Sequence, residues 1–409
     1  MVWTPARSTL AGSSEIPLMT MNIFPNRKDS RMSLWIKLGI LCMMAGTVMV
    51  HGAQTGQGEA TMNQANGFKV SNGTNISHWL SQCFETMPPR RGFFSELDVI
   101  FIRSLGMDHF RLPVDEKELW TEDLEKIPEA WDYLRNALSW ARKHELRVIV
   151  DLHVVRSHHF NAANEGGTNT LWDDPEAQES FLNLWRQLSA ELAYTDVDWV
   201  AYEIMNEAVA DDPEDWNRLI AKAHSLIRER EPRRTLVIGS NRWQIPSTFP
   251  DLKIPDGDPN ILLSFHFYAP LLFTHYRATW VAFYDYDGPV SYPGRIVDDA
   301  ALEKNDYTPA FKDKIRALNG VYDIDALEKE MQPAIEYAKQ KGLPLYCGEW
   351  GCFHAVERKQ RLQWYKDIST ILKRNGIAHA TWDYKGEFGI VDTWTLGVDW
   401  NLVGAILSE

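Results

Sequence analysis

Short apolar runs alternate with longer amphipathic stretches along the chain from about residue 66 onward. Several runs are continuously apolar, such as Val148-Ile149-Val150, and this pattern is typical of strands buried on both faces. Strands that alternate with helices are typical of a parallel sheet built from βα units. The pattern predicts eight strands: Gly73–Ser77, Met107–Pro113, Arg147–His153, Asp198–Asn206, Thr235–Ser240, Ile261–Tyr268, Leu343–Trp350 and Ile377–Asp383.

The stretches between these runs have helical periodicity. Trp131, Leu134, Leu138 and Ala141 recur at spacings of 3, 4 and 3, which places them on one face of a helix. No predicted strand is followed by a Gly-rich dinucleotide or phosphate loop. Eight strand-and-helix units without such a loop favour a closed (β/α)8 TIM barrel over an open doubly wound sheet.

The N-terminal part of the chain has a different pattern. Arg31 and Lys37 precede an apolar run from Leu38 to Val50, and small residues follow the run. This order is typical of a secretory signal peptide, and the run is shorter than the roughly 20 residues that a membrane span needs. We therefore expect residues 1–53 to be an extension with a signal peptide at about 32–53, and residues 54–409 to form one domain. The predicted location is secreted or periplasmic, with an N-terminal membrane anchor as the alternative.

Composition narrows the class of protein further. The 409 residues are 44% hydrophobic and 24% charged, which is typical of a globular chain. The net charge of −14 argues against a nucleic-acid partner, because phosphate binding needs a basic surface. The chain contains 17 Trp, 14 Tyr and 17 Phe, and aromatic faces bind flat apolar ligand surfaces. Outside the signal segment, Cys83, Cys347 and Cys352 permit at most one disulfide, and the sequence does not select the pair.

The ends of the predicted strands carry the candidate chemistry, because active sites of (β/α)8 barrels lie at the C-terminal ends of their strands. Glu207 ends the fourth strand and Glu349 ends the seventh. Two facing carboxyl groups can cleave a glycosidic bond, one as the acid that protonates the leaving oxygen and the other as nucleophile or base. Further polar and aromatic residues at strand ends are Asn75, His78, Arg111, Asp115, Asp151, His153, Asn206, Trp243, His266, Tyr268, Trp350, Trp382 and Asp383.

The two carboxyl groups need different environments, because the acid must hold a proton that the nucleophile must lack. We expect Arg111 and Tyr268 to donate hydrogen bonds to Glu349 and to lower its pKa. Glu207 is expected to lie nearer to apolar and aromatic surface. The alternative is that both glutamates belong to structural ion pairs.

The order of these residues resembles that of glycoside hydrolase family 5, the retaining two-glutamate barrel hydrolases. The resemblance implies that Glu207 is the acid/base and Glu349 the nucleophile. It also implies that Asn206 holds a sugar 2-hydroxyl and that Trp382 lies under the sugar ring at the cleavage site. The matching motifs are Arg111 in Arg-Leu-Pro, His153 in Asp-Leu-His, Asn206-Glu207, His266-Phe267-Tyr268, Glu349 and Trp382.

Two loops depart from the family pattern and concern the choice of sugar. The segment from Val154 to Asn161 differs from the loop that many members carry after strand three. The connection from Ala269 to Tyr322 is too long for a plain link between strand and helix, and such loops are usually functional. We expect it either to wall a subsite or to block one end of the cleft. The expected substrate-contacting residues are Asn75, His78, Arg111, His153, Asn206, Trp243, His266, Tyr268, His275, Trp280 and Trp382.

Other interpretations of the same residues remain open. His153, His158 and His159 suggest a metal site, but no His-Glu-x-x-His spacing accompanies them, so neither metal nor other cofactor is expected. A barrel that binds glycans without cleaving them, or a transglycosylase, would share the aromatic residues. We expect a monomeric hydrolase of a β-linked polysaccharide or oligosaccharide, with endo-acting cleavage of β-1,4-glucan as the first choice. Activity as a β-mannanase, xyloglucanase or exo-β-glucosidase is the alternative.

Overall fold

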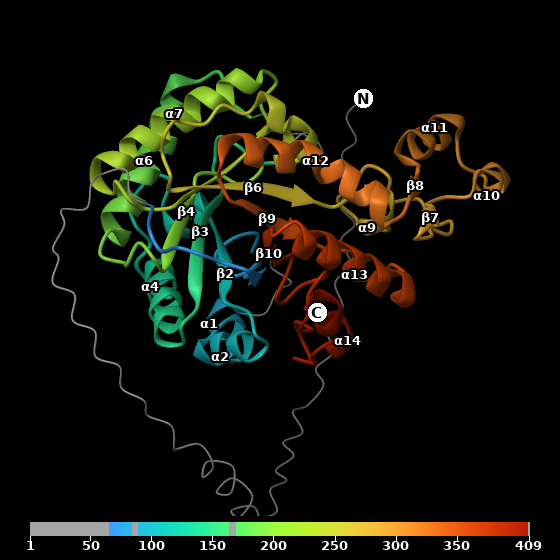
Figure 1. The fold of residues 1–409 in the computed structure, drawn as a ribbon, viewed down its shortest axis with the longest axis horizontal. Coiled ribbons are helices and arrows are strands. Elements are labelled where there is room, and N and C mark those ends of the chain that lie inside the picture. Colours follow the sequence, from blue (N-terminus) through green and yellow to red (C-terminus); the bar gives the residue numbers. More distant parts are fainter. Residues whose placement is uncertain (1–64, 84–88, 163–168, 408–409) are drawn as a thin grey trace, which may run out of the picture. The chain divides into compact units, whose positions relative to one another are not determined.

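The computed structural model describes residues 65–83, 89–162 and 169–407. Eight parallel strands close into one barrel in the order β1-β10-β9-β6-β5-β4-β3-β2 (Figure 1). The prediction of a (β/α)8 barrel is confirmed, and each predicted strand overlaps one of these eight. The predicted signal segment lies outside the described residues. The barrel strands are β1 Asn72–Asn75, β2 His109–Asp115, β3 Arg147–Val154, β4 Val200–Glu203, β5 Leu236–Gly239, β6 Ile261–Phe267, β9 Leu345–Trp350 and β10 Ala378–Thr381.

Helices surround the barrel and begin where the sequence supplies starting signals. Proline in the first turn, which lacks the N–H that would be unpaired there, opens α4 Pro128–Lys143, α6 Pro175–Leu192, α7 Pro213–Arg230 and α11 Pro309–Leu318. Asp212 caps α7 by accepting a hydrogen bond from Glu214 N. The helices are α1 Arg90–Phe93, α2 Glu96–Ser104, α3 Glu116–Leu119, α4 Pro128–Lys143, α6 Pro175–Leu192, α7 Pro213–Arg230, α8 Asn241–Gln244, the 3-10 helix η1 Pro246–Asp251, α12 Ile324–Lys341, α13 Arg358–Arg374 and α14 Trp400–Ile406.

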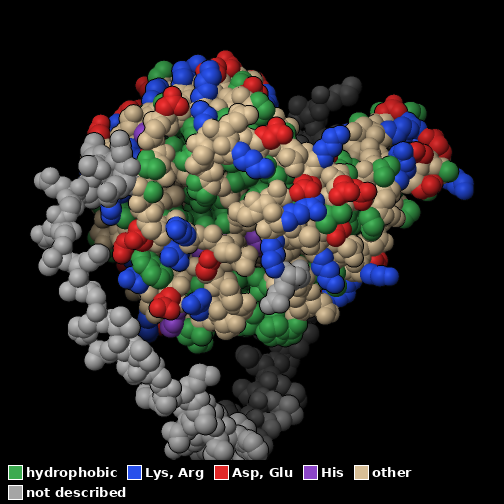
Figure 2. All heavy atoms as spheres, in the orientation of Figure 1, with side chains coloured by type: hydrophobic (Ala, Val, Ile, Leu, Met, Phe, Trp, Pro, Cys, Tyr) green, Lys and Arg blue, Asp and Glu red, His purple; other side chains and the backbone are tan. Residues whose placement is uncertain are grey.

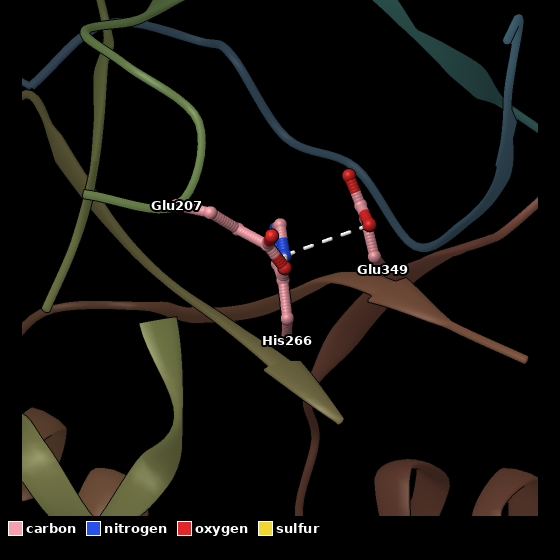
Figure 3. Close-up of side chains that lie close together, drawn as sticks. All are labelled: Glu207, His266 and Glu349. Atoms are coloured by element: carbon pink, nitrogen blue, oxygen red, sulfur yellow. Dashed lines mark hydrogen bonds and ion pairs between the residues drawn. The ribbon is translucent and has the colours of Figure 1, made fainter. Parts of the chain in front are cut away.

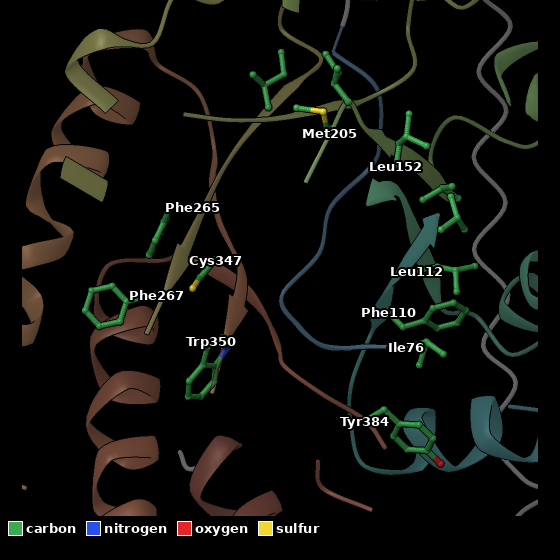
Figure 4. Close-up of a cluster of buried hydrophobic side chains, with 14 of the residues drawn as sticks. Ile76, Phe110, Leu112, Leu152, Met205, Phe265, Phe267, Cys347, Trp350 and Tyr384 are labelled. Carbon is green, nitrogen blue, oxygen red and sulfur yellow. The ribbon is translucent and has the colours of Figure 1, made fainter. Parts of the chain in front are cut away.

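Alternation of side chains along the strands separates two apolar cores. Ile149 of β3 and Val237 of β5 pack together in the smaller core, with residues of four other strands. Their chain neighbours, Val148 and Val150 among them, belong to the larger core that the strands form with the helices. Figure 4 shows part of this larger core. Since successive strand residues point to opposite faces, the smaller core is the interior of the barrel.

The long connection after β6 is a small structure of its own. It contains α9 Leu271–Thr274, β7 Gly294–Arg295, α10 Asp299–Lys304, α11 Pro309–Leu318 and β8 Val321–Tyr322. The strands β7 and β8 form an antiparallel pair. Figure 1 shows α10 and α11 to one side of the barrel, beyond α9.

The surface carries charges of both signs, and the cysteines of the described residues are thiols. On the face shown in Figure 2, acidic and basic side chains are interspersed. No helix in residues 65–83, 89–162 or 169–407 is long and apolar enough to cross a membrane. The thiols of Cys83, Cys347 and Cys352 are all free.

Candidate active site

The site consists of inward-facing residues that follow, along each strand, the residues of the apolar barrel interior. On β3, Ile149 lies in the interior core, and Asp151 and His153 follow at two-residue steps. On β4, Glu203 follows Ala201 in the same way. Because side chains alternate along a strand, residues two positions apart face the same way. The barrel interior therefore changes from an apolar layer to a charged layer near the C-terminal ends of the strands.

Arg111 of β2 is the centre of the charged layer and is fully buried. Its guanidinium contacts three carboxylates: Nε lies 2.6 Å from Glu203 Oε2, Nη2 2.9 Å from Asp151 Oδ2, and Nη1 2.7 Å from Glu349 Oε1. Nη2 also donates to Asn206 Oδ1 at 2.8 Å. One arginine therefore fixes groups from β3, from β9, and from β4 and the segment after it.

The side chains of Glu207, His266 and Glu349 converge (Figure 3). His266 Nδ1 lies 2.8 Å from Glu207 Oε1 and 3.6 Å from Glu349 Oε2. Tyr268 donates its hydroxyl hydrogen bond to Glu349 Oε2 at 2.9 Å. Glu349 thus has the two donors expected from the sequence, Arg111 and Tyr268. One carboxylate oxygen of Glu207 and one of Glu349 lie within 4.8 Å of each other and of a His266 nitrogen.

The environments of Glu207 and Glu349 give the two carboxyl groups different pKa values. Burial raises the pKa of Glu207, and the charge of Glu349 adds to it, so that the pKa lies well above the ordinary value. Burial also raises the pKa of Glu349, while the charge of Arg111 and the Tyr268 hydrogen bond lower it. The expected lowering by these two groups is present, but burial outweighs it. A proton shared by the pair therefore resides on Glu207.

His266 and His153 remain neutral near pH 7. Burial, followed by the charge of Arg111, holds the pKa of His266 well below its usual range. Burial lowers the pKa of His153 to about 4. The neighbours of His153 fit a neutral ring, because Nδ1 lies 2.7 Å from Asp151 Oδ2 and Nε2 lies 2.8 Å from the amide nitrogen of Gln82. The amide can donate to Nε2 while Nδ1–H donates to Asp151.

Trp382 stacks on His153, and Asn206 has a side-chain donor without a partner among the described residues. The ring of Trp382 lies parallel to that of His153, with 5.6 Å between centroids and 9° between planes. Asn206 is held at Oδ1 by Arg111, whereas its buried Nδ2 has no hydrogen-bond partner among the described residues. An oriented, unpaired donor beside two carboxyl groups can bind a ligand hydroxyl.

Aromatic side chains from the β6, β9 and β10 loops form a cluster near Tyr268. Trp280 is 38% exposed, and its ring lies 5.4 Å from that of Phe353 and 6.2 Å from that of Phe388. His275 lies 5.0 Å from Tyr268. We call Trp280, His275, Phe353 and Phe388 the aromatic wall. The structure thereby brings His275 and Trp280, both predicted from the sequence, next to a residue that contacts Glu349.

The other predicted residues occupy different depths. Trp243 is 41% exposed and donates from Nε1 to Phe160 O at 2.8 Å, on the side of the β3 and β5 loops. The His78 ring lies 6.4 Å from that of Trp382. Asn75 is fully buried; it accepts from Arg111 at 3.0 Å and donates to Gly348 O at 2.9 Å. Asn75 therefore lies among the supports of the glutamates.

Sequence reasoning missed Glu203, Phe353 and Phe388. Glu203 stands two residues after Ala201, so strict alternation along β4 was a usable signal for an inward carboxylate. Phe353 and Phe388 lie in loops, where alternation gives no direction, and only the tertiary structure brings them to Trp280.

The donor atoms of Glu207, His266 and Glu349 are also close enough to hold a metal ion. Within the part of the chain that the structure describes, His153, His158 and His159 form no such group. His158 Nε2 instead accepts a hydrogen bond from Val209 N at 3.1 Å. The guanidinium of Arg111, 2.7 Å from Glu349, opposes a cation beside that carboxylate.

The barrel and its paired glutamates define the class of the protein, a glycoside hydrolase, and the comparisons with known proteins agree. The model of the cellulase family, glycosyl hydrolase family 5, matches residues 65–387. The chain belongs to this family.

Named relatives agree with the family assignment. The chain is 32% identical to endoglucanase C of Acetivibrio thermocellus over 323 residues, which are 76% of this chain and 90% of that protein. It is 28% identical to cellodextrinase A of Ruminococcus flavefaciens over 329 residues, 80% of this chain and 87% of that protein. An endoglucanase of Thermotoga maritima has the same fold, with a TM-score of 0.65 and 22% identity over 82% of this chain and 97% of that chain. The protein is a cellulase-like glycoside hydrolase.

Proposed function

We propose that the protein is an endo-acting β-1,4-glucanase that cleaves its substrate by double displacement with retention of configuration. The observation that carries the proposal is the pairing of Glu207 with Glu349, whose nearest oxygens lie within 4.8 Å of each other. Retaining glycosidases hold their carboxyl groups about 5–5.5 Å apart, whereas inverting enzymes need about 6.5–9.5 Å to admit a water between them. The separation supports retention.

In the first step, Glu349 attacks the anomeric carbon and forms a glycosyl ester. The bond from that carbon to the departing oxygen breaks, and Glu207 delivers its proton to the oxygen. Arg111 and Tyr268 partly offset the effect of burial on the pKa of Glu349, whereas burial and the charge of Glu349 raise the pKa of Glu207 well above its ordinary value, so the proton of the pair resides on Glu207. This division of protonation matches the two roles.

In the second step, Glu207 removes a proton from water, the water oxygen attacks the anomeric carbon, and Glu349 leaves as a carboxylate. The enzyme returns to its initial protonation, and the net reaction adds one water molecule. Asn206 Nδ2 donates to a hydroxyl of the bound sugar, and Trp382 offers its ring as a stacking face.

β-1,4-Glucan is the proposed substrate because the relatives at 32% and 28% identity are an endoglucanase and a cellodextrinase. The aromatic wall, with Trp280 38% exposed, supplies apolar surface for further sugar rings. The N-terminal basic and apolar segment supports export of the protein to the place where such polymers occur.

The testing experiment is a product profile of the purified protein on β-glucan, xyloglucan, β-mannan, xylan and aryl β-glycosides. The variant Glu349→Gln should remove nearly all turnover without loss of folding. Its matched control is Glu191→Gln. Glu191 lies on the outer helix α6, and its carboxylate pairs with Arg135. Internal cleavage of β-glucan that is lost only in Glu349→Gln supports the proposal. A folded protein that cleaves none of these substrates, or only transfers sugars to an added acceptor, contradicts it.

A further inference from the structure

A turn after β5, the segment α8 in which Arg242 and Trp243 lack helical φ and ψ, holds the backbone of Glu207 from outside the charged layer. Glu207 has a φ of 41°, in the left-handed region that favours glycine. Such a conformation persists where the surrounding contacts impose it. The contacts come from residues 241–244, so the placement of Glu207 depends on a segment other than its own.

This turn pairs with the chain that carries Glu207 residue by residue. Glu207 N donates to Gln244 Oε1 at 2.8 Å, and Trp243 N donates to Ala208 O at 3.2 Å. Asn241 closes the pairing at Ala210, where its side chain both accepts and donates at 2.9 Å. The turn is therefore a template for the segment from Glu207 to Ala210.

Gln244 is the member of the turn that reaches the barrel interior. Its side chain is buried, and it passes over Gly239, where an added Cβ would lie 2.1 Å from the Gln244 amide nitrogen. Arg242, Trp243 and Gln244 have φ values of 54°, 62° and 54°, which directs the last side chain back toward the strands. Because Gly239 has no side chain, there is space for the Gln244 amide.

The Gln244 amide contacts Glu207 through its oxygen, and its nitrogen is linked to Glu349 through Glu203 and Arg111. Oε1 accepts from Glu207 N, while Nε2 donates to Glu203 Oε1 at 3.1 Å. Glu203 Oε2 in turn receives Arg111 Nε at 2.6 Å, and Arg111 holds Glu349 at 2.7 Å. A donor and an acceptor are both required at this position, and glutamine supplies both.

We propose that Gln244 is a positioning residue that couples the placement of the two glutamates. Through Oε1 it fixes the backbone of Glu207, and through Nε2, Glu203 and Arg111 it fixes Glu349. This inference rests on the proposed function, in which both glutamates act on the substrate. Charged and titratable groups that face this chain of contacts are Glu203 of β4, Arg111 of β2, Asp151 of β3, His266 of β6 and Glu349 of β9.

The first test is Gln244→Met, which keeps the side-chain volume and removes both hydrogen bonds. We expect kcat on a β-1,4-glucan oligosaccharide to fall about 10- to 100-fold with little change in KM, because a displaced catalytic group costs rate more than binding. The loss should be smaller on dinitrophenyl β-cellobioside, whose leaving group needs no proton from Glu207. The matched control is Gln187→Met, which removes the hydrogen bonds of Gln187 to Trp120 and Leu124 on the outside of the barrel.

The second test, Gln244→Glu, separates hydrogen bonding from packing. A protonated glutamate can accept from Glu207 N and donate to Glu203, whereas an ionised one repels Glu203. Activity should therefore approach that of the wild type at the acidic end of the pH profile and fall as the pH rises, with an alkaline limb at lower pH than in the wild type. Activity equal to that of Gln244→Met at every pH would overturn the proposal.

A third measurement does not depend on turnover. Carboxyl ¹³C NMR, assigned with Glu207→Gln and Glu349→Gln, follows the titration of both glutamates in the wild type and in Gln244→Met. We expect the pKa of Glu207 to fall in Gln244→Met, because a loosened backbone admits water and weakens the effect of burial. Unchanged titration in a folded variant would overturn the proposal. A wild type that cleaves no glucan, together with a Glu207 pKa that falls in Gln244→Met, would refute the proposed β-1,4-glucanase function and leave the positioning role supported.

Discussion

Arg111 donates to Glu349 across 2.7 Å, and the same guanidinium contacts Asp151 and Glu203 at 2.9 and 2.6 Å. With Glu207 nearby, four buried carboxyl groups surround one arginine. Burial raises the pKa of Asp151 and that of Glu203 to about 7 in each case. Their charges cannot all be balanced by Arg111, so the cluster retains protons near neutral pH. The contact with Arg111 favours Glu349 as the ionised member of the pair.

The Tyr268 hydrogen bond should tune the acidic limb of the pH profile. Tyr268→Phe removes a donor that lowers the pKa of Glu349, so this pKa should rise. Because the proposed nucleophile must be ionised, activity is lost at a higher pH as the solution is acidified. A hydrogen bond to a charged group is worth about 1.5–3 kcal/mol, which corresponds to a shift of about one to two pH units. The measurement is kcat/KM against pH.

The control for this prediction is Tyr276→Phe, which removes a hydroxyl that donates to Asp287 O in the long connection after β6. It should leave the acidic limb in place. An acidic limb that does not move in Tyr268→Phe would show that this hydrogen bond does not stabilise the charged form of Glu349.

Trp280 should contribute to binding of sugar rings away from the bond that is cleaved. Trp280→Ala should raise KM for long oligosaccharides more than for short ones, by about 5- to 30-fold if one stacked ring is worth about 1–2 kcal/mol. Trp400→Ala provides a control, because Trp400 is 62% exposed but packs against Phe101 near the C-terminus. Equal effects of Trp280→Ala on all chain lengths would contradict a subsite formed by the aromatic wall.

Dialysis against a chelator should leave turnover unchanged, since the proposed steps use carboxyl groups and water alone. Added Zn²⁺ should inhibit weakly, because Glu207, His266 and Glu349 offer donor atoms within 4.8 Å of one another while Arg111, 2.7 Å from Glu349, opposes a cation there. Inhibition should grow with pH as the carboxyl groups lose their protons. The assay is the initial rate on β-glucan, and a chelated enzyme that regains activity only with metal would contradict the mechanism.

Asp258 should stabilise the fold near neutral pH and not in strong acid. Hydrogen bonds from His224, Arg228 and Asn260 outweigh the effect of burial and lower its pKa to about 2. A depressed pKa gives stability that is present above the unfolded value of about 3.9 and is lost as the pH falls toward about 2. Asp258→Asn should cost about 1–2 kcal/mol of unfolding free energy at pH 7, after allowance for partial exposure.

Urea unfolding at several pH values measures this effect. The control Asp132→Asn removes an exposed partner of Arg135 and should change stability by less than about 0.5 kcal/mol. A difference between Asp258→Asn and the wild type that persists unchanged at pH 2 would contradict the ionic origin of the stabilisation.

Much of the fold could be predicted because continuous apolar runs and strand ends carry local signals. The runs around Ile149 and Val237 identify β3 and β5, and the alternation that places them in the barrel interior also places Asp151 and His153 at the mouth. Glu207 and Glu349 were identifiable because they lie at strand ends that the barrel brings together, although β4 stops at Glu203 and Glu207 lies in the segment beyond it.

The remaining features depend on contacts that local sequence does not encode. Three consecutive residues with positive φ, none of them glycine, direct Gln244 inward, and no residue pattern marks such a turn. The antiparallel pair β7 and β8 consists of two residues per strand, too few for an alternation signal. The stacking of Trp382 on His153 joins residues from different strands and needs the closed barrel.

The most direct test of the central claim is the configuration of the first product, followed by ¹H NMR during hydrolysis of a β-1,4-glucan oligosaccharide. Glu349 as nucleophile and Glu207 as acid/base predict that the β-anomer appears first and the α-anomer later by mutarotation. Initial release of the α-anomer would contradict double displacement by this pair.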